Sequence, residues 1–177
     1  MTGYQGKTPP APSTFISEEQ LRQHRCCFTG HRPEKLTRTE KEIKDELEEE
    51  ILLAIQDGFT TFISGMARGV DLWAAEIVLN MRRHYKNLRL ICAVPYEGFE
   101  ERWSLKCQQL YRSILNQADL IRVIAQSYYP GVFQIRNEWL VDHSRRVIAV
   151  FNGDCSGTKN TLDYALLQGV PIRVIGG

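Results

Sequence analysis

Short apolar segments alternate with longer amphipathic segments along this chain. In the amphipathic segments, apolar residues recur at helical spacing, as Ile43, Leu47, Ile51 and Ile55 do before Gly58 ends the pattern. The apolar segments are short enough to be strands, and they cover residues 25–29, 59–64, 88–94, 119–125, 146–151 and 172–175. After the helix that Gly58 ends, further helices are predicted over residues 70–84, 103–116, 134–144 and 158–168.

The regular alternation of strands and helices predicts the fold class. It is typical of an α/β protein with a Rossmann-like, doubly wound, mainly parallel sheet and helices on both faces. The strands are mostly apolar, as strands buried on both faces should be. We expect at least five parallel strands, with the strand at residues 25–29 in the middle of the sheet.

Capping residues predict where two of the helices begin. Ser17 and Gln20 have the spacing of a capping box, and so do Thr37 and Glu40 before the long helix. The residues before Ser17 are polar and rich in proline, which discourages regular structure. We therefore expect residues 1–16 to form a flexible tail and residues 17–177 to form a single domain.

Composition excludes several classes of protein. Of 177 residues, 43% are hydrophobic and 24% are charged, which is typical of a folded globular protein. The net charge of +1 lacks the basic excess of most nucleic-acid-binding proteins, so a nucleic-acid partner is not expected. The five cysteines show no C-x-x-C spacing, so neither a disulfide framework nor a metal site is predicted. No apolar run is long enough to span a membrane, which predicts a cytoplasmic protein.

Glycine-rich loops at the ends of strands carry the candidate chemistry. In open parallel sheets, ligands bind at the carboxyl ends of the strands. There, residues 64–71 read SGMARGVD and lead from a strand directly into a helix. Glycine lets the backbone approach a ligand closely, and a helix N-terminus attracts phosphate. Asp71 in the first turn can cap the helix or accept a hydrogen bond from a ribose hydroxyl. The alternative is a tight turn with a capping aspartate and no ligand.

A second loop of this kind, residues 153–158, precedes the last predicted helix. Its Ser156 or Thr158 can cap the helix or bind a phosphate oxygen. Two such loops at one sheet edge favour a phosphate site over two unrelated turns. Elsewhere on this edge, the guanidinium group of Arg32 has the geometry to hydrogen-bond phosphate oxygens. His31 is expected to be a solvated loop residue. Tyr96 suits either stacking on a base or packing at the rim.

These loops, with two polar residues of the helix over 134–144, give a set of candidate ligand-binding residues. No Ser-His-Asp set, H-E-x-x-H motif or Walker lysine is present, so no catalytic residue, cofactor or metal ligand is assigned. The candidates are Thr29, Gly30, Arg32, Ser64, Gly65, Arg68, Gly69, Asp71, Tyr96, Arg136, Asn137, Gly153, Gly157 and Thr158.

Four sequence segments together resemble the YpsA family of the SLOG superfamily: CCFTGHRPEKL, FISGMARGVDLWAAE, FQIRNEWLVDHSRRVIAVFNG and SGTKNTLDYA. The resemblance covers residues 25–175. The superfamily includes the LOG phosphoribohydrolases and the DNA-processing protein DprA, whose S-G-x-A-x-G-x-D stretch is similar to residues 64–71. The resemblance implies a Rossmann-like fold and a site for a nucleotide or nucleotide-sugar, such as an ADP-ribose or NAD derivative.

One departure from the LOG pattern affects the expected activity. LOG enzymes carry a catalytic glutamate in a P-G-G-x-G-T-x-x-E motif, and Thr161 stands at that position here. A hydroxyl does not serve as an acid or base near neutral pH as a carboxylate does. Asp71 or Glu76 would have to replace the glutamate, and Asp71 is expected to be ionised because helix N–H groups would lower its pKa.

Three functions follow from the residues and the resemblance. The first is binding of a nucleotide-like ligand by a sensor or regulatory module. The second is a LOG-like N-glycoside hydrolase, and the third is DprA-like binding of single-stranded DNA. The sequence leaves open whether any reaction is catalysed and whether the protein forms a homo-oligomer.

Overall fold

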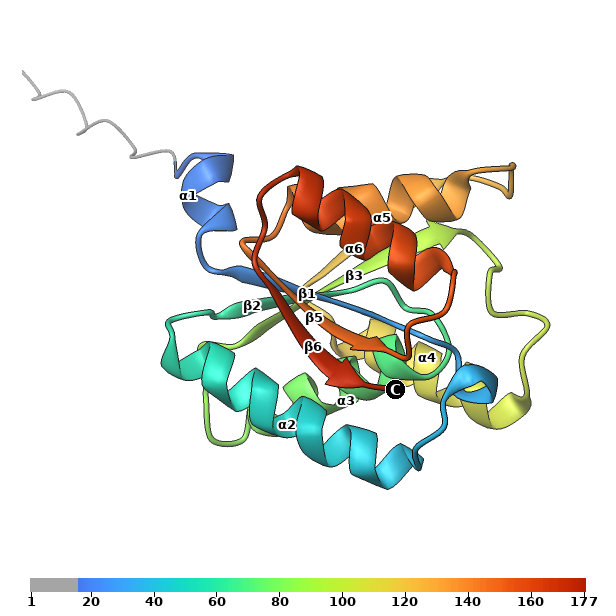
Figure 1. The fold of residues 1–177 in the computed structure, drawn as a ribbon, viewed down its shortest axis with the longest axis horizontal. Helices are drawn as coiled ribbons and strands as arrows, with labels where there is room; N and C mark the ends of the chain where they lie inside the picture. The colour runs from blue at the N-terminus through green and yellow to red at the C-terminus, as the bar shows by residue number, and fades with distance from the viewer. Residues whose placement is uncertain (1–15) are drawn as a thin grey trace, which may run out of the picture.

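The computed structural model describes residues 16–177, so all of the expected N-terminal tail except Ile16 lies outside the described residues. It contains a six-stranded sheet with the order β4-β3-β2-β1-β5-β6, in which every neighbouring pair is parallel (Figure 1). β1 lies between β2 and β5, as expected. The strands are β1 (Arg25–Gly30), β2 (Thr61–Ser64), β3 (Arg89–Tyr96), β4 (Leu120–Ala125), β5 (Arg146–Phe151) and β6 (Ile172–Gly176).

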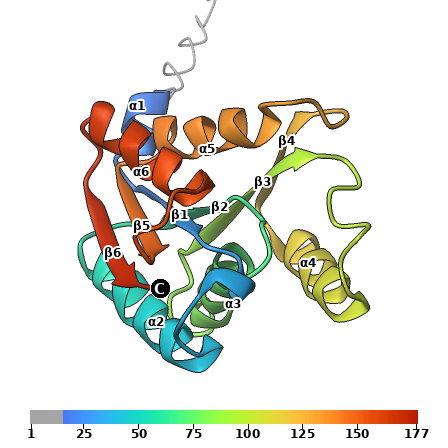
Figure 2. The same cartoon turned by 45° about the vertical axis from the view of Figure 1, so that its right-hand side comes forward.

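Helices cover both faces of the sheet, which makes the fold the predicted doubly wound α/β type (Figures 1 and 2). α2, α3 and α4 lie on one face, and α5 and α6 pack side by side on the other. The helices are α1 (Glu18–Arg22), α2 (Glu40–Gln56), α3 (Val70–Met81), α4 (Leu105–Gln117), α5 (Val132–Asp142) and α6 (Gly157–Leu167), with a 3₁₀ turn at Pro33–Lys35.

Each face of the sheet has its own hydrophobic core. Successive residues of β1 point to opposite faces, so Cys26 and Phe28 belong to the core under α2, α3 and α4, whereas Cys27 belongs to the core under α5 and α6. Each of the three is fully buried. Because β1 is packed on both faces, its carboxyl end is held in one position. The residues that follow β1 therefore have a fixed place at the sheet edge.

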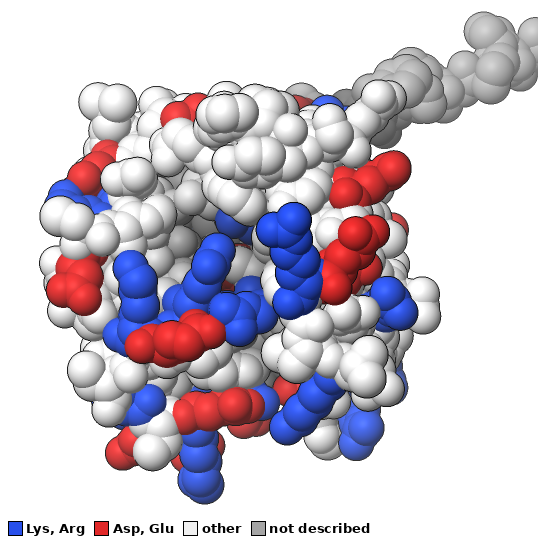
Figure 3. Space-filling model, turned by 90° about the vertical axis from the view of Figure 1, so that its right-hand side faces the viewer, with Lys and Arg blue, Asp and Glu red and all other residues white. Residues whose placement is uncertain are grey.

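Because every strand is parallel, all six end at the same edge of the sheet. Figure 3 looks onto this edge and shows a hollow with Lys and Arg side chains around it. The fold thus brings the loops after β1, β2, β3 and β5 to one place, which is where the sequence predicts a ligand site.

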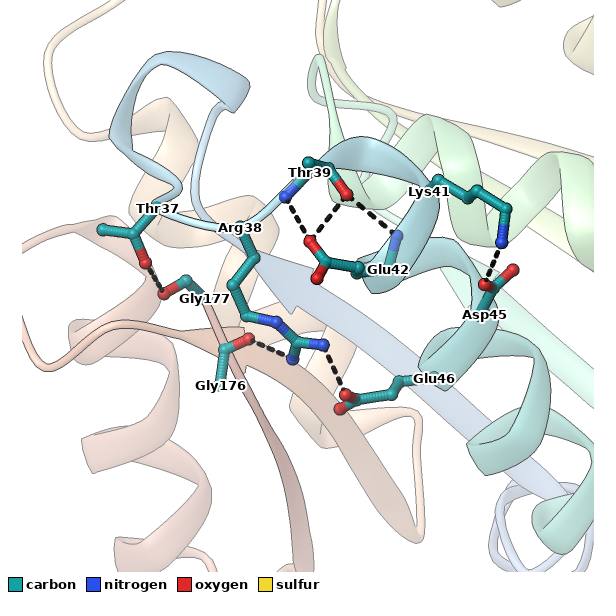
Figure 4. Close-up of polar contacts among 9 residues, drawn as sticks. All are labelled: Thr37, Arg38, Thr39, Lys41, Glu42, Asp45, Glu46, Gly176 and Gly177. Carbon is teal, nitrogen blue, oxygen red and sulfur yellow. Dashed lines mark hydrogen bonds and ion pairs between the residues drawn. The ribbon is translucent and has the colours of Figure 1, made fainter.

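The capping box of α2 is two residues later than predicted (Figure 4). Thr39 is the N-cap: its Oγ1 accepts from the Glu42 backbone N–H at 3.3 Å, and the Glu42 carboxylate accepts from the Thr39 N–H at 2.9 Å. Thr37 instead donates its hydroxyl to the Gly177 carbonyl at 2.8 Å and ties the chain to the end of β6. The predicted capping box of Ser17 and Gln20 is confirmed.

Candidate functional site

A cavity of about 320 Å³ opens at the carboxyl edge of the sheet. It lies between the loops that follow β1, β2, β3 and β5, the helix α5 and the first turn of α6. Its walls are formed by Thr29, Gly30, His31, Arg32, Lys35, Ala67, Asp71, Phe99, Phe133, Arg136, Asn137, Leu140, Ser156, Gly157 and Thr158.

The loop between β5 and α6 presents a helix N-terminus to this cavity. Ser156 is the N-cap of α6, and its Oγ accepts from the Lys159 backbone N–H at 3.2 Å. Gly157 and Thr158 form the first helical positions, where backbone N–H groups have no partner inside the helix. The side chain of Ser156 bonds the Lys159 amide and not those of Gly157 and Thr158, and the positive end of the helix dipole faces the cavity.

The loop between β2 and α3 is bonded mainly to itself. Ser64 Oγ donates to the Asp71 carbonyl at 2.9 Å and accepts from the Met66 N–H at 3.1 Å. The Ala67 N–H donates to Asp71 Oδ2 at 3.2 Å. Met66 has φ of 62°, a left-handed conformation that is uncommon for a residue other than glycine. These bonds hold the loop in a compact turn, with Ala67 and Asp71 reaching the cavity wall.

Arg136 and Asn137 of α5 connect the two loops. The Arg136 guanidinium is buried, donates to the Gly65 carbonyl, and lies with Nη1 at 3.8 Å from Asp71 Oδ2. Its Nε donates to Asn137 Oδ1 at 2.9 Å, and Asn137 Nδ2 donates to the Gly157 carbonyl at 3.4 Å. A continuous polar network thus runs from Asp71 through α5 to the first turn of α6.

The expectation that Asp71 has a lowered pKa is wrong. Burial is the largest influence and raises its pKa from 3.8 to about 6, against the opposing effects of Arg136 and of the Ala67 N–H. Asp71 is 5% exposed, and an ionised carboxylate loses its hydration there. The sequence motif predicts the N–H contact correctly but not how deeply the side chain is buried. Near pH 6 the group therefore exists in both protonation states.

The cavity brings together many of the predicted residues and leaves others outside. Thr29, Gly30, Arg32, Asp71, Arg136, Asn137, Gly157 and Thr158 line it. Ser64, Gly65, Arg68, Gly69, Tyr96 and Gly153 do not.

The residues outside the cavity have other contacts. Arg68 forms an ion pair with Glu34, with Nη2 at 2.6 Å from Oε1. Gly69 is the N-cap of α3 with φ of 85°, and a side chain there would meet Pro33. Tyr96 packs edge-on against Phe99 and belongs to an aromatic cluster with Tyr128 and Phe133. Packing at the rim is therefore the arrangement that Tyr96 adopts.

Sequence reasoning missed part of the cavity wall. His31, which was expected to be solvated, is 2% exposed and stacks on Phe151. Phe99 and Phe133 also line the cavity and pack against each other. The available signal was their position between a strand and the next helix or in its first turn, since Phe99 follows β3 and Phe133 is the second residue of α5. The catalytic alternative with Glu76 is not supported, because Glu76 pairs with Lys44 between α2 and α3 and does not line the cavity.

The described residues lack a metal-binding cluster and a membrane-spanning helix. Residues 16–177 hold no group of three or more His, Cys, Asp or Glu side chains placed to bind a metal ion. Within the same range, no helix has the length and apolar character needed to cross a membrane.

A family model described as the YspA SLOG family matches residues 26–169. The chain belongs to this family. The matched range begins in β1 and ends after α6, so it includes every loop and helix that lines the cavity.

Curated relatives are about 30% identical to the chain within the aligned regions. A UPF0398 protein of Brevibacillus brevis is 30% identical over 68% of the chain, and a UPF0398 protein of Bacillus cereus is 32% identical over 66%. The chain spans 65% and 64% of the length of these two relatives. The SPbeta prophage-derived protein YoqJ of Bacillus subtilis is 30% identical over 68% of the chain and 80% of its own length.

Solved structures of DNA processing protein A share the fold. The protein from Streptococcus pneumoniae aligns with a TM-score of 0.62 and 19% identity, over 89% of this chain and 52% of its own. The protein from Helicobacter pylori, described for its single-stranded DNA binding mode, aligns with a TM-score of 0.63 and 18% identity, over 90% of this chain and 68% of its own. At this identity the likeness shows the Rossmann-like fold.

Proposed function

We propose that the protein binds a nucleotide-like ligand in the cavity at the carboxyl edge of the sheet, as a sensor or regulatory module. The observation that carries this proposal is the pairing of a helix N-terminus with cationic side chains around one hollow. The first turn of α6, Arg32, Lys35 and Arg136 all line the cavity. Backbone amides at a helix N-terminus and a guanidinium are the groups that proteins use to bind phosphate.

Aromatic residues of the cavity suit the uncharged part of such a ligand. Phe99 and Phe133 line the cavity and pack against each other, and aromatic faces of this kind stack on nucleobases. The volume of about 320 Å³ falls within the range of small-molecule pockets, which begins at about 300 Å³. Asp71 also lines the cavity and can accept a hydrogen bond from a ribose hydroxyl when it is ionised.

Thr158→Val tests this proposal at the phosphate end. Thr158 is 5% exposed and lines the cavity, so valine removes its hydroxyl while keeping its shape. Loss of one hydrogen bond to a charged phosphate should weaken AMP or ADP-ribose binding by about tenfold or more, measured by calorimetry.

Thr161→Val is the matched control. Thr161 lies one turn further along α6, is fully buried, and donates its hydroxyl to the Gly157 carbonyl at 2.8 Å rather than to the cavity. Its substitution should leave affinity nearly unchanged. If wild-type protein binds none of AMP, ADP-ribose and NAD at millimolar concentration, the proposed function is wrong.

N-glycoside hydrolysis is the second candidate, and the raised pKa of Asp71 favours it. A carboxyl group with a pKa of about 6 can exchange protons near neutral pH, as acid–base catalysis requires. Asp71 is also the one carboxyl group among the described residues that lines the cavity. Release of free base from AMP or ADP-ribose, followed by chromatography and abolished in Asp71→Asn, would establish the hydrolase in place of the binding module.

Binding of single-stranded DNA is the third candidate. DNA processing protein A of Helicobacter pylori, which shares the fold, is described as binding single-stranded DNA, which weakens the expectation that nucleic acid is excluded here. Tyr128 is 59% exposed beside the aromatic cluster at the cavity rim, where a strand of bases would have a stacking surface. Salt-dependent binding of a short oligonucleotide, stronger than binding of AMP, would favour this function over a mononucleotide site.

A further inference from the structure

Two buried hydroxyl groups in the cavity have no partner in the described protein. Thr29 near the end of β1 is 6% exposed, Thr158 in the first turn of α6 is 5% exposed, and both line the cavity. Among residues 16–177 neither hydroxyl forms a hydrogen bond, and neither belongs to the fully enclosed polar atoms that lack a partner, so both keep surface open to the cavity. Buried hydroxyl groups nearly always have a partner, so these two indicate a polar group of the ligand.

Other hydroxyl groups around the cavity are used by the protein itself. Ser64 bonds within the loop between β2 and α3, Ser156 caps α6, and Thr161 bonds within α6. Thr29 and Thr158 come from neighbouring segments, because β1 and β5 are paired and α6 follows β5. Together with the free N–H groups of the α6 first turn, their hydroxyls provide an enclosed set of donors that suits a phosphate group.

Two cationic side chains lie at the exposed rim of the same cavity without a carboxylate partner. Arg32 and Lys35 line the cavity, are exposed, and form no ion pair within residues 16–177. Arg32 is the N-cap of the 3₁₀ turn that Lys35 ends, and side chains three positions apart in such a turn lie on the same face. Arg68 of the neighbouring loop is instead paired with Glu34. The charges of Arg32 and Lys35 are therefore not balanced by the described protein.

The positive charge extends from the enclosed part of the cavity to its rim. Burial lowers the pKa of the Arg136 guanidinium, Asp71 opposes this effect, and the charge of Arg32 adds to it. Arg32 therefore lies close enough to act on the buried arginine. Burial also lowers the pKa of His31, and the ammonium group of Lys35 acts in the same direction. Lys35 thus adds its charge on the side of the cavity that the segment after β1 forms.

We infer that the ligand carries a diphosphate group, with one phosphate bound by Thr29, Thr158 and the first turn of α6 and the second beside Lys35; this rests on the proposed function above. The hydroxyl groups are enclosed and the ammonium group is exposed, so the two sets of groups lie at different depths. One phosphate held by the hydroxyl groups leaves the charge of Lys35 unbalanced, and a second phosphate balances it. The diphosphate can be terminal, as in ADP, or bridging, as in ADP-ribose.

Lys35→Gln tests the position of the second phosphate. We expect wild-type protein to bind ADP, ADP-ribose or both at least about tenfold more tightly than AMP, measured by calorimetry at low salt. A chelator in the buffer keeps divalent cations from the phosphates. Lys35→Gln should reduce this advantage to within about twofold and leave the AMP affinity within about twofold of the wild type. Lys86→Gln, at an exposed position between α3 and β3, removes the same charge at the opposite edge of the sheet and should bind every compound as the wild type does.

Thr29→Val tests the position of the first phosphate. Valine keeps the shape of the side chain and removes its hydroxyl group. Because the first phosphate is common to AMP, ADP and ADP-ribose, the affinity for all three should fall by a similar factor of about tenfold. Equal affinity of Thr29→Val and the wild type for all three compounds would overturn the assignment of the enclosed hydroxyl groups to a phosphate.

The possible results separate this inference from the proposed function. A loss in Lys35→Gln that affects ADP alone supports a terminal diphosphate, and a loss that includes ADP-ribose supports a bridging one. If the wild type binds AMP as tightly as ADP and ADP-ribose, the inference is overturned and the proposed function stands. Equal losses of AMP and ADP affinity in Lys35→Gln also overturn it. If the wild type binds none of these compounds, the proposed function fails and the inference fails with it.

Discussion

Two glycine-containing loops meet at the same sheet edge, and they use their glycines in different ways. In the loop between β2 and α3, a side-chain carbon at Gly65 would lie 2.5 Å from Arg136 Nη1, and one at Gly69 would lie 2.7 Å from Pro33 Cδ. In the loop between β5 and α6, a side-chain carbon at Gly157 would approach nothing closer than 3.9 Å, and one at Gly153 would have no neighbour within 4 Å.

The difference shows that similar loop sequences can be filled by neighbouring protein atoms in one place and leave open space in another, where the proposed ligand would bind. The first loop is closed by its own hydrogen bonds and by Arg136, and its glycines admit neighbouring atoms of the protein. The second loop leaves open space in front of a helix N-terminus, which a phosphate group can occupy. Each of the following predictions tests this contrast.

Substitution of a glycine by alanine should give the largest difference in stability between the two loops. Gly69 has φ of 85° and ψ of −122°, a region that residues with a side chain rarely adopt, and its new methyl group would overlap Pro33. Gly69→Ala should therefore lower the free energy of unfolding by about 3 kcal/mol. Gly157→Ala should change it by less than about 1 kcal/mol, because the helical position has room for a methyl group.

Urea denaturation of both variants provides the measurement. The fold should be retained in Gly157→Ala, and its affinity for AMP should fall because the methyl group enters the cavity. If Gly157→Ala were destabilised as much as Gly69→Ala, the two loops would not differ in how tightly their glycines are packed.

The second prediction concerns the pH dependence of stability and comes from Asp71. Its pKa is about 6 in the folded protein and about 3.8 when unfolded, so the folded state binds more protons between these values. Wild-type protein should therefore lose stability as pH rises from 4 to 7, relative to Asp71→Asn, which does not titrate. The difference of about two pKa units corresponds to roughly 3 kcal/mol in total, of which about 2 kcal/mol is expected between pH 4.5 and pH 7.5.

The comparison between the two proteins removes the contributions of other titrating groups, including His31, from the result. The test requires the unfolding free energies of both proteins at pH 4.5 and at pH 7.5. A difference between wild type and Asp71→Asn that stays constant across this range would show that the folded pKa is close to 3.8. The β2–α3 loop would then be more open to water than its hydrogen bonds indicate.

The sequence predicted the fold more completely than the site. The parallel sheet follows from apolar strands such as Leu90–Val94, which are buried on both faces, and from the helical spacing of Ile43, Leu47 and Ile51. These patterns are local and periodic. The register of one capping box was misplaced by two residues because Thr37 and Thr39 both have an acidic residue three positions later.

The site was predicted only where local sequence carries the signal. Gly157, Thr158 and Arg32 were found because glycine-rich loops and arginines are recognisable in a single segment. The burial of His31 depends on Phe151, which is distant in sequence, and the raised pKa of Asp71 depends on how closely α5 packs over it. Neither property can be derived from the residues next to these side chains.

The two arginines of neighbouring loops provide the smallest predicted effect. Arg68 pairs with Glu34 at the surface and does not line the cavity, whereas Arg32 lines it. An exposed ion pair stabilises a protein by at most about 1 kcal/mol, so Arg68→Gln should change stability little and leave AMP affinity within about twofold. Arg32→Gln should weaken AMP binding by about fivefold at low salt, and the loss should shrink as added salt screens the charge. Calorimetry at two salt concentrations would measure the AMP affinity of both variants and its salt dependence. An equal loss of affinity in both variants would show that the β2–α3 loop also binds the ligand, and that the division between a packing loop and a ligand-binding loop is wrong.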